Sequence, residues 1–224
     1  MTTKPRIITL GRFAVIVDGE ELPTSAWGSR RSRQLAKRLV AARGWPVTRD
    51  ELIDMLWPDE HDPQRLGSRL SVQLSAVRRV LKGGVIADRQ AVRLDPDEVE
   101  TDLGRLFGAD TDDAVIAAYT GEFLPEDRYD DWTAAPRDEA LGRFVAAARR
   151  VAGAAAATGD HDTTARLARR LIEADVYDTA AHEQLVTALQ LAGEPAQARR
   201  AHDAWRTAMA ELDIDIPDYD TFST

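Results

Sequence analysis

The spacing of hydrophobic residues predicts a mainly α-helical chain with small β-sheets near its N-terminus. Residues 7–22 are rich in β-branched side chains and alternate around Asp18–Gly19, a dipeptide typical of two-residue hairpin turns. After this hairpin, apolar residues recur every three or four positions, which predicts helices. The predicted elements that follow are helices over 30–43, 49–57 and 64–82 and a small hairpin over 85–94.

Residues typical of helix ends support this order of elements. Thr48 and Glu51 have the spacing of a capping box, which begins a helix. Pro58 ends that helix because proline has no N–H to donate, and Gly83–Gly84 closes the next one. A helix, a short capped helix, a loop, a longer helix and a hairpin together give the topology of a winged helix-turn-helix.

The second half of the chain is rich in alanine and is predicted to be helical throughout. Gly159 and Gly193 stand 34 residues apart, the tetratricopeptide period, and each precedes a helix that follows another helix. The acidic, proline-containing segment 95–102 is the predicted boundary between a winged-helix domain over 1–100 and an all-α, tetratricopeptide-like domain over 101–224. The helices predicted for the second domain cover residues 111–119, 134–157, 162–174, 178–192 and 195–212.

The net charge of the 224-residue chain, −9, taken alone disfavours a nucleic-acid partner. The charge is unevenly distributed, however. Residues 1–100 contain 17 basic and 14 acidic side chains, residues 101–224 contain 12 and 24, and residues 24–93 contain 14 and 7. Two halves of opposite charge indicate two domains with different partners.

Composition excludes several classes of protein. The chain has no cysteine, so disulfides, thiolate metal sites and cysteine nucleophiles are excluded, and its four histidines lack metal-ligand spacing. No apolar run approaches the roughly 18 residues of a membrane span, and the first residues lack the apolar region of a signal peptide. We therefore expect a cytoplasmic protein that is not an enzyme, uses no cofactor or metal, and does not bind a membrane.

Two groups of residues receive a structural interpretation. The carboxylates Glu126–Asp127 and Asp130–Asp131 have no EF-hand spacing and no nearby histidine, and are predicted to lie in a solvated loop. The tryptophans are predicted to anchor the core, as single large aromatics in helical patterns usually do. They are Trp27, Trp45, Trp57, Trp132 and Trp205.

The third predicted helix has one apolar face and one basic face. At about 100° per residue, its apolar residues fall within about 80° and should face the core. The opposite face carries small residues and arginines; small side chains allow a close approach to the DNA major groove, and arginines bind guanine edges or phosphates. The predicted contacts on this face are Arg65, Ser68, Arg69, Val72, Ser75 and Arg79.

Two other basic regions are candidates for DNA contact. Arg89 lies in the turn of the second hairpin, the wing, and is predicted to reach the minor groove or a phosphate. Arg30, Arg31 and Arg33 lie at a helix start, where positive charge is unfavourable to the helix dipole. Contact with phosphates would explain their position; the alternative is that they only solvate the helix start.

These residues also carry a resemblance to a known family. Residues 10–22 and 29–60, which include DELIDMLWPDE, resemble the OmpR-type winged helix of the Streptomyces antibiotic regulatory proteins. The second half resembles the bacterial transcriptional activator domain of that family, most specifically at YTGEFLPE over residues 119–126. Lys37 and Arg38 depart from the apolar residues that the family usually has in the first helix.

The resemblance implies a sequence-specific transcription factor. It implies a homodimer that binds direct repeats in double-stranded promoter DNA and recruits RNA polymerase through its σ subunit. Mapped onto this chain, the recognition helix covers 64–82, the wing 85–94 and a polymerase-facing loop 58–63.

Two alternatives stay open at this point. One is a protein–protein adaptor whose tetratricopeptide-like domain binds a peptide; a salt titration separates it from a DNA-binding protein, whose affinity falls steeply with salt. The other is a DNA-binding repressor, which the position of the operator relative to the promoter distinguishes from an activator.

Overall fold

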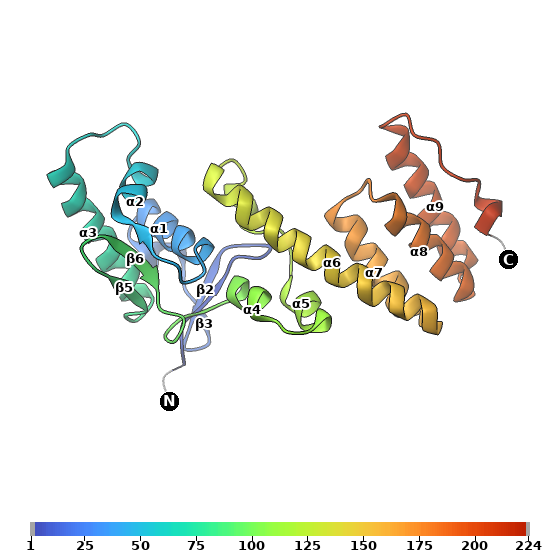
Figure 1. Cartoon of the computed structure of the whole chain (residues 1–224), viewed down its shortest axis with the longest axis horizontal. Coiled ribbons are helices and arrows are strands. Elements are labelled where there is room, and N and C mark those ends of the chain that lie inside the picture. The colour runs from blue at the N-terminus through green and yellow to red at the C-terminus, as the bar shows by residue number, and fades with distance from the viewer. Residues whose placement is uncertain (1–2, 223–224) are drawn as a thin grey trace. The chain divides into compact units, whose positions relative to one another are not determined.

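The computed structural model describes residues 3–222, which form two compact units. The first unit combines the chain up to Ala109 with Ala118–Ala140, and the second combines Asp110–Ala117 with the chain from Leu141 onward. Helices dominate, and the small sheets lie in the N-terminal part of the chain, which confirms the predicted fold class (Figure 1). The predicted division into domains 1–100 and 101–224 stays a prediction.

A four-stranded sheet opens the first unit, in the order β3-β2-β1-β7. Asp18 and Gly19 have φ angles of 53° and 87°, the two positive values that a type I′ turn requires, and they join β2 to β3 as the sequence predicts. The strands of this sheet are β1 (Arg6–Ile8), β2 (Ala14–Val17), β3 (Glu20–Glu21) and β7 (Glu100–Thr101).

Three helices and a three-stranded sheet form the helix-turn-helix and its wing. The capping box is present: the Thr48 hydroxyl accepts from the Glu51 N–H (3.2 Å), and the Glu51 carboxylate accepts from the Thr48 N–H (3.0 Å). The hairpin of β5 and β6 lies beside α3 (Figure 1). The elements are α1 (Arg30–Ala41), β4 (Val47–Thr48), α2 (Arg49–Leu56), α3 (Pro63–Val80), β5 (Val85–Ala87) and β6 (Ala91–Leu94).

The acidic segment 95–102 is folded into the first unit rather than exposed as a linker. Val99 is buried, and β7 pairs in parallel with β1. The segment then continues into a helix that the sequence pattern did not predict, α4 (Asp102–Gly108).

Asp102 fixes this arrangement with a carboxylate that is buried beneath the end of β1. Its two oxygens accept hydrogen bonds from the backbone N–H groups of Thr9 and Leu10 and from the Thr9 hydroxyl, each at 2.7 Å. The N–H of Leu103 donates to the same carboxylate (2.8 Å). Four donors therefore compensate for removing this charge from water.

A later segment also packs against the end of β1. Leu10 and Phe123 form an isolated β-bridge, and the Leu124 N–H donates to the Thr9 carbonyl (2.8 Å). Phe123 and Leu124 are fully buried. Two short 3-10 helices follow, η2 (Pro125–Asp127) and η3 (Asp131–Thr133). The whole segment Ala118–Ala140 belongs to the same compact unit as the winged helix.

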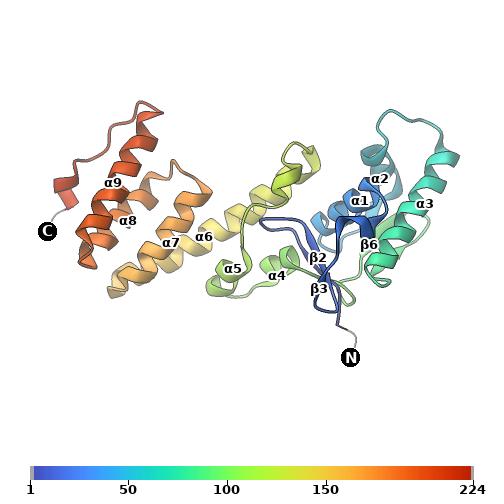
Figure 2. The same ribbon diagram turned by 180° about the vertical axis from the view of Figure 1, so that it is seen from behind.

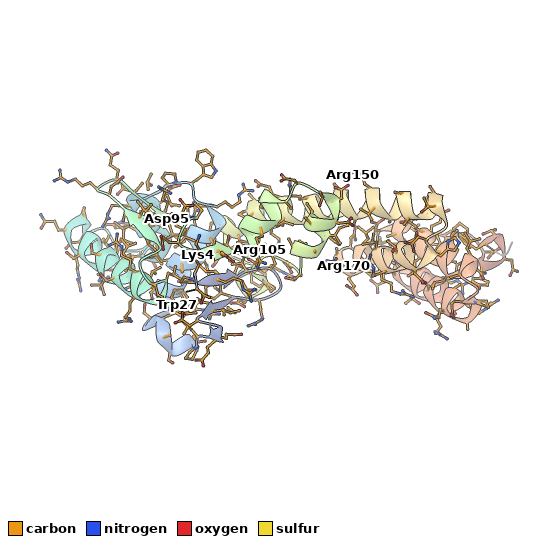
Figure 3. The ribbon with its side chains drawn as sticks, turned by 90° about the horizontal axis from the view of Figure 1, so that it is seen from below. Lys4, Trp27, Asp95, Arg105, Arg150 and Arg170 are labelled. Atoms are coloured by element: carbon orange, nitrogen blue, oxygen red, sulfur yellow. The ribbon has the colours of Figure 1, made fainter. Side chains whose placement is uncertain are left out.

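The second unit is a stack of helices, of which α7, α8 and α9 lie side by side in both ribbon views (Figures 1 and 2). Gly159 and Gly193 both have φ of 76°, directly before α7 and α9, consistent with the predicted repeat. Arg150 and Arg170, labelled in Figure 3, hold α5: one pairs with Asp112 and the other donates to the Ile116 carbonyl. The helix α6 (Ala134–Thr158) begins in the first unit and enters the second at Leu141. The other elements are α5 (Asp112–Ala118), whose last residue falls in the first unit, α7 (His161–Ala174), α8 (Thr179–Leu191), α9 (Pro195–Ala210) and η4 (Tyr219–Phe222).

The prediction that the tryptophans anchor the core is wrong for one of them. Trp45 is 72% exposed. It follows Arg43 and Gly44, which both have positive φ, in the turn between α1 and β4, so its side chain stands outside the helical pattern that suggested burial. Trp132 is half-buried, and the prediction is confirmed for the other three, which are Trp27, Trp57 and Trp205.

We predict that Asp102→Ala lowers the free energy of unfolding by about 2–4 kcal/mol, because it removes one charged acceptor and leaves buried N–H donors unpaired. Urea denaturation of the full chain measures this loss. The exposed Asp97→Ala is the matched control and should leave the free energy of unfolding unchanged. An equally small effect of Asp102→Ala would show that the buried carboxylate does not stabilise the fold.

Candidate nucleic-acid interface

The third helix presents one face to the core and one to solvent. It begins with Asp62, whose side chain accepts from the Arg65 N–H (3.1 Å), followed by Pro63, which suits a first helical turn. Its inward side chains are buried, and Leu66, Leu70, Leu74 and Val77 are among those predicted from the sequence. Leu81, also predicted, is buried directly after the helix, and Val80 is buried although the sequence pattern did not place it on this face.

The outward face of α3 carries a line of exposed side chains, which we call the recognition stripe. Its members are spaced by three or four residues, so they lie along one side of the helix. All of them are exposed to solvent. The stripe consists of Arg65, Ser68, Val72, Ser75 and Arg79, all predicted from the sequence as contacts to DNA.

Arg69, the sixth residue predicted on this face, is held differently. Its guanidinium forms an ion pair with Glu60, in the loop before α3. The hydrogen bond within this pair lowers the pKa of the Glu60 carboxyl. By contrast, the guanidinium groups of Arg65 and Arg79 have no hydrogen bond or ion pair with the described part of the chain.

The turn of the wing is preorganised and presents Arg89. The Asp88 carboxylate accepts from the N–H groups of Gln90 (2.7 Å) and Ala91 (2.8 Å), which fixes the turn and lowers the pKa of Asp88. Arg49, in the first turn of α2, donates to the Asp88 carbonyl (3.2 Å). Arg89 stands exposed at this turn, on the hairpin where the sequence analysis placed it.

Two of the three basic residues at the start of α1 are engaged within the protein. Arg31 donates to the Leu56 carbonyl (3.0 Å), and its guanidinium lies 5.6 Å from the ring centre of Trp57. Arg33 pairs with Glu126 (2.7 Å). Arg30 is exposed at the helix start. The structure therefore gives Arg31 and Arg33 partners inside the first unit, whereas the stripe and the wing turn leave their cations open to solvent.

Sequence reasoning missed a buried lysine that shares Glu126 with Arg33. The Lys37 side chain is only 3% exposed, and its ammonium pairs with Glu126 (2.8 Å) and with Asp127. The Phe13 ring centre lies 4.9 Å from the Lys37 Nζ and 5.1 Å from the Arg33 guanidinium carbon, so both cations lie against the same aromatic ring. The signal was present as a cation at a position where apolar residues are usual, but its partners lie 89 and 90 residues away.

The interpretation of the acidic loop as a solvated loop is accordingly wrong for part of it. Asp127 is 12% exposed, because it faces the buried ammonium of Lys37. Burial raises the pKa of the half-buried Asp130, and the neighbouring charge of Asp127 raises it further. The loop is thus an electrostatic partner of α1.

A groove of about 400 Å³ runs beside the recognition stripe. One wall is the turn Trp27–Ser29, with Trp27 labelled in Figure 3, and the other is the C-terminal half of α3. The Ser29 hydroxyl donates to the side-chain oxygen of Gln73 (2.6 Å), so the remaining hydrogen-bonding atom of that amide is its nitrogen, a donor. The groove therefore offers donors at the edge of the stripe, from Gln73 and Arg79.

Residues 3–222 contain no group of three or more side chains that could together hold a metal ion. None of the helices in that part of the chain has the length and apolar character needed to cross a membrane.

The chain is similar to one family model and to a solved structure of a known protein. A family model described as "Bacterial transcriptional activator domain" matches residues 108–222. The structure of Mycobacterium tuberculosis EmbR in complex with a low-affinity phosphopeptide is similar, with a TM-score of 0.69 and 22% sequence identity. The match covers 98% of this chain but 64% of that one, so the chain spans less than two thirds of EmbR. No curated protein matches the chain.

We predict that Lys37→Met lowers the free energy of unfolding by about 2–4 kcal/mol, because it leaves Asp127 buried without its counter-ion. Thermal or urea unfolding of the full chain checks this. Lys82→Met is the matched control: Lys82 pairs with Asp18 at the surface, where ion pairs contribute little, and no measurable change is expected. Equal effects of the two substitutions would contradict the account.

A second prediction concerns pH. Because the pKa of Asp130 is raised above its ordinary 3.8 in the folded protein, the unfolded chain binds fewer protons, and this carboxyl costs stability as pH rises above that value. Asp130→Asn cannot ionise, so it should melt at a higher temperature than the wild type near neutral pH and at the same temperature near about pH 3. A difference in melting temperature that does not vary with pH would count against this assignment.

Proposed function

Because the chain belongs to the bacterial transcriptional activator domain family, whose members are transcription regulators and not enzymes, we propose that it is a cytoplasmic activator that binds promoter DNA through the first unit. In this proposal α3 lies in the major groove and the β5–β6 hairpin contacts the minor groove or a phosphate.

The observation that carries the proposal is the recognition stripe on α3. Arg65 and Arg79 are fourteen residues apart, so at 1.5 Å per residue their Cα atoms are separated by about 21 Å along the helix axis. That length corresponds to about six base pairs at 3.4 Å each. Two unpaired guanidinium groups, with Ser68, Val72 and Ser75 between them on the stripe, suit a helix that lies close to base edges and reaches guanines or phosphates at both ends.

The second unit supports the rest of the proposal by its charge and its stacked helices. The acidic half of the chain is unsuited to DNA, and we assign to it homodimerisation on direct repeats and contact with RNA polymerase through the σ subunit, as the family resemblance implies. The loop before α3, residues 58–63, is exposed and is the proposed polymerase-facing loop.

One observation favours a second function, a peptide-binding adaptor. A groove of about 430 Å³ lies among α6, α7 and α8, and Leu191 at its edge is 54% exposed. A salt titration separates the two functions. Affinity for DNA falls steeply as salt rises, whereas an adaptor binds no duplex or shows a flat dependence. A repressor would bind DNA equally well but would lower transcription from its promoter in vitro.

We predict that Arg65→Gln and Arg79→Gln each weaken binding to a duplex selected by the full chain. The expected loss is about 1–3 kcal/mol if the contact is to a base, or a drop of about 1 in the salt slope if it is to a phosphate. Fluorescence anisotropy at several salt concentrations measures both quantities.

Arg33→Gln is the matched control, because Arg33 is already paired with Glu126. It should change neither the affinity nor the salt slope. If Arg33→Gln weakens binding while both α3 variants bind as tightly as the wild type, α3 is not the helix that contacts DNA.

A further inference from the structure

The side chains of the recognition stripe are arranged symmetrically, by chemical type, about the centre of the stripe. Along one side of α3 it presents a cation, a hydroxyl, an aliphatic side chain, a second hydroxyl and a second cation. Val72 stands at the centre, seven residues from Arg65 and seven from Arg79. A spacing of seven residues is close to two helical turns, so the three side chains point in nearly the same direction.

The two hydroxyl groups have no hydrogen to offer outward. The Ser68 hydroxyl donates to the Gln64 carbonyl (3.1 Å), and the Ser75 hydroxyl donates to the Ser71 carbonyl (2.9 Å), each one turn back along α3. What each presents to solvent is therefore its oxygen lone pairs. Arg69, one turn before Val72, is drawn to Glu60. Ser68, Val72 and Ser75 thus have no outward donor, and the nearest donor beside them is the Gln73 amide nitrogen in the neighbouring groove.

The centre instead offers an apolar surface. Val72 is 65% exposed, although the other large aliphatic side chains of α3 are buried. Its neighbours one turn away include Ser68, Ser75 and Ala76. Their side chains are short, so a flat surface can approach and touch Val72. Val72 is therefore not part of the hydrophobic core. Its exposed position between short side chains suits contact with a small apolar group of a partner.

The major groove contains one such group. Guanine and adenine present acceptors at N7, and cytosine and adenine present amino donors, whereas thymine presents a C5 methyl group beside its O4 acceptor. Because Ser68, Val72 and Ser75 have no outward donor, they leave a purine N7 acceptor unpaired, and the apolar side chain of Val72 gains by covering a methyl group.

We propose that Val72 contacts the C5 methyl group of a thymine at the middle of each bound half-site. This inference rests on the proposed function and adds to it the identity of one base. Arg65 and Arg79 lie about three base pairs to either side, at 1.5 Å per residue and 3.4 Å per base pair.

The test uses the full chain and a duplex that it selects from a random-sequence pool. Each thymine of that duplex is replaced in turn by deoxyuridine, which removes only the methyl group. One thymine per half-site should then lose affinity by about fourfold, the effect of one buried methyl-sized group. Val72→Ala should weaken binding to the thymine duplex by a similar factor and should bind the uracil and thymine duplexes equally.

Two controls separate this contact from other causes. Val176→Ala makes the same truncation at a side chain that is 48% exposed in the second unit, and it should keep the full thymine preference. The melting temperature of Val72→Ala should equal that of the wild type because the side chain is exposed.

Each possible result bears either on the contact between Val72 and thymine or on the proposed DNA binding. If a duplex is selected but no uracil position weakens binding, or if Val72→Ala keeps the preference for thymine, the contact is wrong while the proposed DNA binding stands. If no duplex is enriched, the proposed function itself fails and the inference with it.

Discussion

A lysine ammonium inside a protein must have carboxylates beside it, since its burial without them is costly. Lys37 is 3% exposed and meets this requirement with Glu126 and Asp127. The acidic loop must therefore stay on α1, and the segment that leads to it pairs with the end of β1. The compact unit that contains the winged helix consequently includes part of the region that the family model assigns to the activator domain.

This constraint decides which cations remain for a partner. The carboxylates that hold Lys37 also hold Arg33, and Arg31 is occupied by the end of α2. Arg31 and Arg33 thus contribute to folding, whereas Arg65 and Arg79 on α3 and Arg89 on the wing face solvent. Charge density along the chain does not distinguish these two groups. They differ in the folded protein, where Arg31 and Arg33 have partners and Arg65, Arg79 and Arg89 face solvent.

Local signals in the sequence were sufficient for much of the fold. The capping box at Thr48, the Asp18–Gly19 turn and the 34-residue period each depend on residues that are close along the chain or repeat regularly. What could not be predicted depends on distant partners. β7 is two polar residues long and exists because it pairs with β1, and Lys37 is explained by carboxylates 89 and 90 residues away. The recognition stripe was predicted because helical periodicity suffices to define a face, but the hydroxyl orientations and the Arg69–Glu60 pair were not.

The central claim is that the partner lies against α3 and the wing and not against the start of α1. Covalent labelling of arginine side chains in the full chain, with and without a selected duplex, tests it most directly when the modified residues are quantified by mass spectrometry. The account predicts that Arg65, Arg79 and Arg89 are labelled in the free protein and protected by the duplex, while Arg33 is labelled weakly in both states. Protection of Arg30 and Arg33 by the duplex, with Arg65 and Arg79 labelled as in the free protein, would contradict it.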